Sequence, residues 1–188
     1  MSDRTTTFDL RKLVYSALFL AIGLVLPFVT GQIPQIGRML SPMHIPVLLC
    51  GFLCGWQYGA AVGFVTPLLR SLLFGMPALY PSAVGMAFEL AVYGLVSGWL
   101  YARFPKKNLA AVYITLVTAL LAGRAVWGLV SFVLYGIIGS RFTFRMFLAG
   151  AFVNAVPGII LHLVVIPPIV MALEKSRANP RSQKEVLR

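Results

Sequence analysis

Three ionisable side chains of this sequence lie inside long apolar stretches: Glu89, Arg70 and Arg124. A charge at bilayer depth costs several kcal/mol unless it is paired or hydrated, so we expect Glu89 to pair with one of the two arginines. One carboxylate cannot neutralise both. The remaining arginine could bind an anionic substrate, most simply a carboxylate, which a guanidinium binds through two parallel hydrogen bonds. The alternative is an ion pair within a helix bundle that has no role in binding.

Polar and aromatic side chains occur near these charges. With a helix rise of about 1.5 Å per residue, most of the set lies about 6 to about 21 Å below the expected outer face. Two loops that contain Pro and Gly, residues 31–40 and 75–81, are expected above it. Such a set is typical of a pocket for a small polar molecule, although the rings could simply pack and the asparagine could join two helices. The predicted substrate-binding residues are Arg70, Tyr80, Glu89, Tyr93, Arg124, Trp127 and Asn154.

The histidines and cysteines are predicted to be structural. His44 is expected to cap or orient the start of a helix, and His162 to be a structural or interfacial residue towards the cytoplasm. Cys50 and Cys54 lie one helical turn apart in an apolar run, where free cysteine packs as a small hydrophobe. Ligand spacings for zinc or haem do not occur, so we predict neither a metal site nor a cofactor.

Enzyme motifs are also lacking. Ser97 and His162 invite comparison with an intramembrane serine protease, but the sequence around Ser97 is not Gly-x-Ser-Gly. There is no HExxH motif and no Gly-rich loop followed by Lys and Ser or Thr for ATP. We therefore predict that the chain is not an enzyme, and that any uphill transport draws energy from another chain or an ion gradient.

The composition indicates an all-α integral membrane protein. The chain is 59% hydrophobic and 11% charged, with a mean hydropathy of +0.87. A net charge of +11 could indicate nucleic-acid binding, but that requires basic residues gathered on a solvated face. Here they separate apolar runs, so we expect a membrane partner and no nucleic acid.

Residues 1–188 are predicted to form a single membrane domain, with tails at 1–9 and 174–188 and a bundle of six transmembrane helices over 10–173. The apolar run 41–77 exceeds the roughly 20 residues of one span, and GWQYG at 55–59 interrupts it. We therefore expect two short spans that form a hairpin. The predicted spans are 10–29, 44–55, 59–74, 82–101, 109–138 and 146–173.

The distribution of Lys and Arg supports six spans. With this number, the basic residues of both tails and of the loop 103–108 share one side of the membrane. The other side receives only Arg38, Arg141 and Arg145. Because cytoplasmic loops carry the excess of Lys and Arg, both termini are predicted to be cytoplasmic.

The chain resembles a known family over roughly residues 10–173. The six-span layout, the face formed by Ala17 and Ala21, and the hairpin PMHIPVLLCGFLCGWQYGAAVGFVTPLLRSLL are similar to the substrate-binding S components of energy-coupling factor (ECF) vitamin transporters. The resemblance implies capture of a vitamin from outside, in a bacterial plasma membrane. It also implies docking through Ala17 and Ala21 on a coupling transmembrane subunit that is driven by two cytosolic ATPases.

The segments GRMLSPMHIPVLL and TPLLRSLLFGMP are similar to those of pantothenate-type members. Pantothenate has one carboxylate, an amide and hydroxyls, which an arginine, Asn154 and an aromatic residue could bind. Folate, riboflavin and another precursor are the alternatives, because the fold is shared while the pocket varies. A self-sufficient carrier is a second class, but such carriers often contain inverted repeats, and none is evident here.

Overall fold

The computed structural model describes residues 10–30, 41–137, 139–141 and 143–178. The predicted N-terminal tail, the predicted loop 31–40 and residues 179–188 lie outside this part. The described part is helical and contains no strand, which confirms the predicted all-α class for these residues. The elements are α1 (Leu10–Val25), η1 (Leu26–Thr30), α3 (His44–Cys54), α4 (Trp56–Phe74), η2 (Leu79–Ala83), α5 (Val84–Arg103), α6 (Leu109–Ile137), α7 (Phe144–Leu148), η3 (Ala149–Val153) and α8 (Val156–Ala178).

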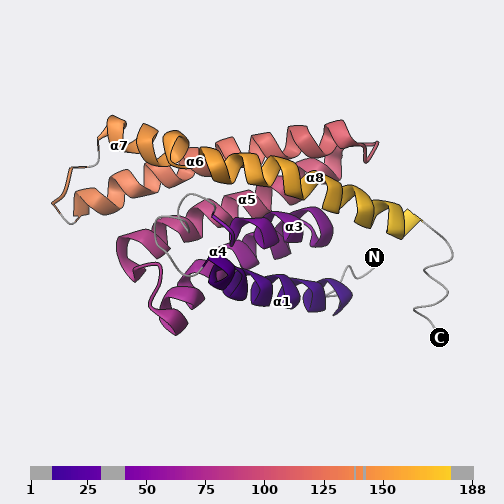
Figure 1. Cartoon of the computed structure of the whole chain (residues 1–188), viewed down its shortest axis with the longest axis horizontal. Helices are drawn as coiled ribbons and strands as arrows, with labels where there is room; N and C mark the ends of the chain where they lie inside the picture. Colours follow the sequence, from indigo (N-terminus) through magenta and orange to yellow (C-terminus); the bar gives the residue numbers. More distant parts are fainter. Residues whose placement is uncertain (1–9, 31–40, 138, 142, 179–188) are drawn as a thin grey trace, which may run out of the picture.

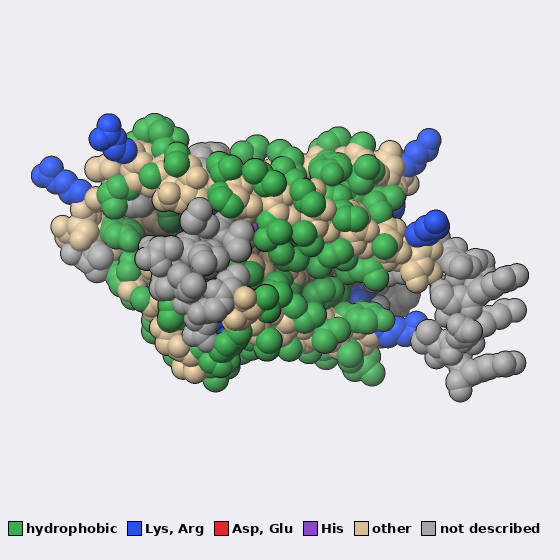
Figure 2. All heavy atoms as spheres, in the orientation of Figure 1, with side chains coloured by type: hydrophobic (Ala, Val, Ile, Leu, Met, Phe, Trp, Pro, Cys, Tyr) green, Lys and Arg blue, Asp and Glu red, His purple; other side chains and the backbone are tan. Residues whose placement is uncertain are grey.

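Four helical stretches of the described chain are long and apolar enough to cross a membrane. They are Leu10–Val29, Leu79–Arg103, Leu109–Ile137 and Phe144–Ser176. Hydrophobic side chains cover much of the face shown in Figure 2, and Lys and Arg project from its two ends. The helix α3 is apolar but shorter, so the crossing of α3 and α4 as two further spans stays a prediction.

The helices α3 and α4 meet at Gly55, whose φ of 98° is a conformation that favours glycine. The N–H of Gly55 bonds to the carbonyl of Gly51, and the N–H of Gly59 bonds to that of Gly55. The break is therefore one residue long, shorter than the predicted 55–59, because Trp56 to Gly59 already belong to α4. A Cβ on Gly59 would lie 2.7 Å from Cα of Gly51, so the two helices touch beside the turn.

Glycines also bring the backbones of α4 and α5 into contact. A Cβ on Gly94 would lie 2.1 Å from the carbonyl oxygen of Gly59, and one on Gly63 would lie 2.2 Å from that of Leu90. Small residues allow this approach in membrane helices, where association depends on close packing. The pair α4–α5 thus forms a tightly packed layer, which α1, α3 and α6 contact, while α8 packs on α3 and α6 (Figure 1).

The short helix α3 is the most enclosed element. Nine of its 11 residues are buried, because α1, α4, α5 and α8 all contact it. It meets α1 where the thiol of Cys50 donates to Oγ of Ser16 at 3.6 Å. Its first residue, His44, is therefore held inside the bundle.

The predicted sixth span is not one continuous helix. It consists of α7, the π-helical segment η3 and α8, with a turn at Asn154 and Ala155. The N–H of Asn154 bonds to the carbonyl of Ala149 at 2.9 Å, the five-residue spacing of a π-turn. This break places His162 only six residues after the start of α8, instead of far along one long helix.

Candidate functional site

A buried carboxylate organises the candidate site. Oε1 of Glu89 lies 3.0 Å from Nη1 of Arg124 and accepts a 2.8 Å hydrogen bond from the hydroxyl of Tyr93. All three side chains are buried, with Glu89 only 2% exposed. Of the two pairings predicted for Glu89, the structure therefore contains the one with Arg124.

The positions of these residues follow from their helices. Glu89 and Tyr93 are four residues apart on α5, so their side chains lie on the same face. Arg124 comes from α6, directly after Gly123. A Cβ on Gly123 would lie 2.1 Å from Cε1 of Tyr93, so only glycine lets α6 approach α5 closely enough for this ion pair.

Both histidines of the chain join this cluster. The ring of His44 lies 5.4 Å from that of Tyr93 and 5.8 Å from that of His162, measured between centroids. Nε2 of His44 is 3.9 Å from Oε1 of Glu89, which is beyond hydrogen-bond length. The ring of His44, from α3, thus lies beside one ring from α5 and one from α8.

Several polar atoms of the cluster have no hydrogen bond within the described chain. They are both ring nitrogens of His44, both ring nitrogens of His162 and Nε of Arg124. The helix α3 has no side-chain cap, so of the two roles predicted for His44 the capping role is wrong, and its role in orienting the start of the helix stays a prediction. Buried polar groups are nearly always hydrogen-bonded, so such a concentration of unbonded nitrogens indicates a place where a ligand could bind.

Arg70 lies elsewhere. Its Nη1 donates to the carbonyl of Leu24 near the end of α1, and its guanidinium carbon lies 5.1 Å from the ring centroid of Phe28 and 5.4 Å from that of Phe74. This buried arginine forms no ion pair within the described residues. Because the guanidinium of Arg70 contacts a carbonyl and two aromatic rings, it joins α1 and η1 to the end of α4.

The other predicted site residues are dispersed. Trp127 lies one turn beyond Arg124 and stacks on Phe147 with ring centroids 6.4 Å apart. Tyr80 is exposed and donates to the carbonyl of Leu134 at 2.8 Å, and the side chain of Asn154 is also exposed. Of the seven predicted residues, Glu89, Tyr93 and Arg124 are in mutual contact around one carboxylate.

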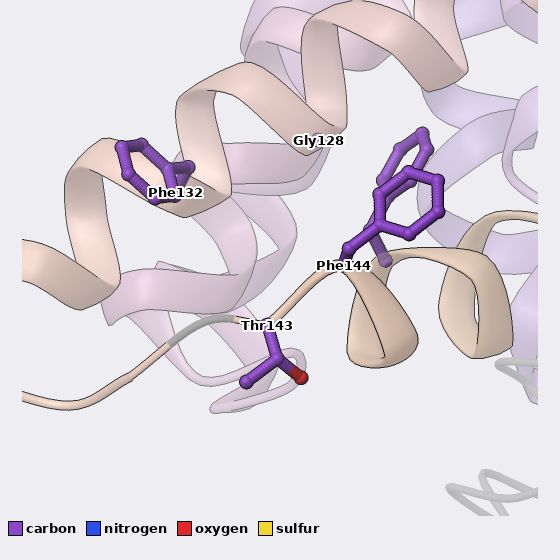
Figure 3. Close-up of a pocket in the computed structure, with 5 residues that line it drawn as sticks. Gly128, Phe132, Thr143 and Phe144 are labelled. Carbon is purple, nitrogen blue, oxygen red and sulfur yellow. The ribbon is translucent and has the colours of Figure 1, made fainter.

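A surface pocket of about 250 Å³ lies next to Trp127, between α6 and α7. Phe132 and Phe144 stand on two sides of it, and Thr143 contributes its only polar side chain (Figure 3). Phe132 is 63% exposed and Phe144 73%. None of the predicted site residues lines this pocket, and its apolar, exposed walls suit contact with lipid better than recognition of a polar molecule.

A protein-family model described as ECF transporter, substrate-specific component matches residues 11–170. The chain belongs to this family. Searches of curated proteins and of solved structures found no match. As an ECF substrate-specific component, the chain is a transporter subunit and not an enzyme, it is a multi-pass membrane protein, and it works with a small-molecule substrate and an ECF module.

In this ECF substrate-specific component, sequence reasoning missed the part played by the two histidines. A signal was present, because the chain has only two histidines and both interrupt apolar segments, where ionisable residues are rare. Their proximity could not be inferred, since they are 118 positions apart and neither is flanked by a polar partner. Ala17 and Ala21 are exposed on α1, and their role in binding a partner stays a prediction.

Proposed function

We propose that this ECF substrate-specific component captures a water-soluble vitamin at the cluster around Glu89, with pantothenate as the preferred cargo. The observation that carries the proposal is the set of five buried nitrogens of His44, His162 and Arg124 that have no hydrogen bond within the described residues. A purely structural ion pair would not need them. Because the cluster is buried, cargo reaches it only when the surrounding helices part locally.

The chemistry of pantothenate suits these groups. A guanidinium has five N–H donors in a planar fork. The 3.0 Å contact between Nη1 of Arg124 and Glu89 leaves Nε for the cargo, whose carboxylate would share this guanidinium with Glu89. The imidazoles offer hydrogen bonds to amide or hydroxyl groups, and the nearby ring of Trp127 supplies an apolar wall. Asn154, Tyr80 and Arg70 are retained as candidates that would contact cargo only after a rearrangement.

Folate, riboflavin and other precursors are alternative cargoes, since members of one fold family differ in their pockets. The test is to purify the chain in detergent and follow tryptophan fluorescence while titrating pantothenate, riboflavin, folate, biotin and thiamine. We expect saturable binding of pantothenate, and loss of the signal change in Trp127→Phe but not in Trp99→Phe, because Trp99 stacks on Arg103 near the end of α5. Saturation by another vitamin would contradict the choice of cargo, and silence from all five would contradict vitamin capture.

Transport is proposed to need a coupling transmembrane subunit and two cytosolic ATPases, with both termini of this chain in the cytoplasm. Ala17 and Ala21 would form the docking face, since both are exposed and lie one turn apart on α1. Reconstitution of the chain alone in liposomes should give no ATP-independent uptake. Uptake without partners would instead make it a self-sufficient carrier.

A further inference from the structure

We propose that His44 and His162 form a hydrogen-bonding slot for an uncharged polar group of the cargo, separate from the arginine that binds its charge. This inference rests on the proposed function and assigns a chemical role to each half of the site. The slot would accept a group that both donates and accepts a hydrogen bond, such as an amide or a hydroxyl.

The geometry shows two imidazoles packed face to face in the protein interior. Their centroids are 5.8 Å apart with an interplanar angle of 25°, and the rings are 2% and 0% exposed. No ring nitrogen meets the distance and angle of a hydrogen bond within the described part of the chain, although Oε1 of Glu89 lies 3.9 Å from Nε2 of His44 and the backbone of Ser41 lies near His162. A buried polar group without a hydrogen bond is destabilising, so two neighbouring imidazoles would not be expected where apolar side chains could fill the same space.

The charge balance of the cluster decides what kind of group fits. Glu89 is already engaged by Arg124 and Tyr93, and within the described residues no second acid is in contact with the imidazoles. The described part of the cluster thus holds no further acid that would favour a cationic group of the cargo beside the imidazoles. A neutral imidazole carries one donor and one acceptor nitrogen, which match an amide or hydroxyl better than a carboxylate.

The test compares two ligands that differ only at the charged end. Pantothenate carries a carboxylate, and pantothenol carries a hydroxyl in its place. His44→Phe and His162→Phe keep an aromatic ring but remove the nitrogens. We expect each variant to weaken both ligands equally, by about tenfold, as for the loss of a hydrogen bond in a buried site. Arg124→Gln should weaken pantothenate more than pantothenol.

Two further variants control for packing. Thr115→Val removes another buried hydroxyl that has no hydrogen bond within the described chain, nine residues before Arg124 on α6, and it should leave both affinities unchanged. His162→Gln restores a donor and an acceptor and should recover part of the affinity. Wild-type affinity in both Phe variants, or a loss confined to pantothenate, would overturn the slot.

A negative result with pantothenate would contradict only the proposed cargo, and the same variants would then be measured with whichever vitamin saturates the fluorescence signal. If no vitamin binds, the proposed function fails. The role of the two histidines is then tested by the thermal unfolding of the variants without ligand. Nitrogens kept for a ligand should be dispensable for folding, so both Phe variants should unfold at or above the wild-type temperature, as should Thr115→Val. A fall of several degrees in the Phe variants would show that the imidazoles serve the fold.

Discussion

The buried cluster depends on Glu89, because one oxygen of its carboxylate contacts both Arg124 and Tyr93. Its removal would leave a buried guanidinium without an anion. While Glu89 is present, its negative charge neutralises that of Arg124. A buried pair without net charge is tolerated in a low-dielectric interior at a moderate cost in free energy.

We therefore expect Glu89→Gln to destabilise the protein by about 3 to 5 kcal/mol, the usual result of breaking one side of a buried ion pair. The measurement is the unfolding temperature in detergent without ligand. Glu174→Gln, near the C-terminal end of α8 and outside the cluster, is the matched charge change and should have little effect. Equal shifts in the two variants would mean that the contact with Arg124 contributes nothing special.

The two buried arginines should differ in binding. Arg124→Gln should reduce affinity for a carboxylate cargo by about tenfold or more, since a charge-assisted hydrogen bond is lost. Arg70→Gln should mainly lower stability, because Arg70 contacts the carbonyl of Leu24 and two phenylalanine rings. Calorimetric titration and thermal unfolding of both variants check this, and a larger binding loss at Arg70 would place the anion site at the other arginine.

At the scale of helices, the contact between α4 and α5 sets how closely the bundle closes. Gly94 faces the carbonyl of Gly59, and Gly123 faces the ring of Tyr93. The glycines thus act twice, since they allow the helices to touch and they bring α6 within reach of Glu89.

Gly94→Ala should destabilise the protein by about 1 to 3 kcal/mol, because its new Cβ must displace the backbone of α4. Gly136→Ala is the control, since a Cβ there meets nothing within 4 Å. The expected difference is measured by unfolding in detergent. If both alanines were tolerated equally, α4 and α5 would not be packed as tightly as described.

The exposed face of α1 gives a second prediction about an element. Ala17→Trp and Ala21→Trp should leave vitamin binding unchanged but reduce uptake in cells that contain the ECF module by about tenfold or more, since a bulky ring disrupts a packed interface. Ala125→Trp, at an exposed alanine of α6, is the control and should retain uptake. Loss of binding in the α1 variants would instead mean that this helix contributes to the cargo site.

For the whole molecule, the arrangement of its two ends bears on orientation. The start of α1, the connection from α5 to α6 and the end of α8 lie at one end, and the connection from α6 to α7 lies at the other (Figure 1). This arrangement agrees with the pattern expected from the Lys and Arg distribution, in which the first end would face the cytoplasm.

Labelling of single cysteines checks the orientation. In a variant with Cys50→Ala and Cys54→Ala, a membrane-impermeant thiol reagent applied to intact cells should modify Ser140→Cys but not Lys106→Cys. Both positions are exposed, so accessibility depends on the side of the membrane. The opposite labelling pattern would reverse the predicted orientation.

The sequence by itself determined the all-α membrane class, the approximate bounds of α1, α5 and α6, and the pairing of Glu89 with an arginine. These features follow from local rules. Segments in lipid must be apolar and must form their backbone hydrogen bonds internally, and a single buried acid is stable only when it is paired with a cation. The resemblance to ECF S components likewise rested on contiguous residues. The family match over residues 11–170 agrees with it at the level of the family.

Only the tertiary structure decided which arginine pairs with Glu89, where Arg70 lies and that His44 meets His162. These contacts depend on which faces of which helices touch, and helical periodicity does not specify the order of helices in space. The break of the sixth predicted span at Asn154 had a similar cause. Its apolar composition suits either a continuous or an interrupted helix, and packing against Trp127 and Gly128 accompanies the interruption.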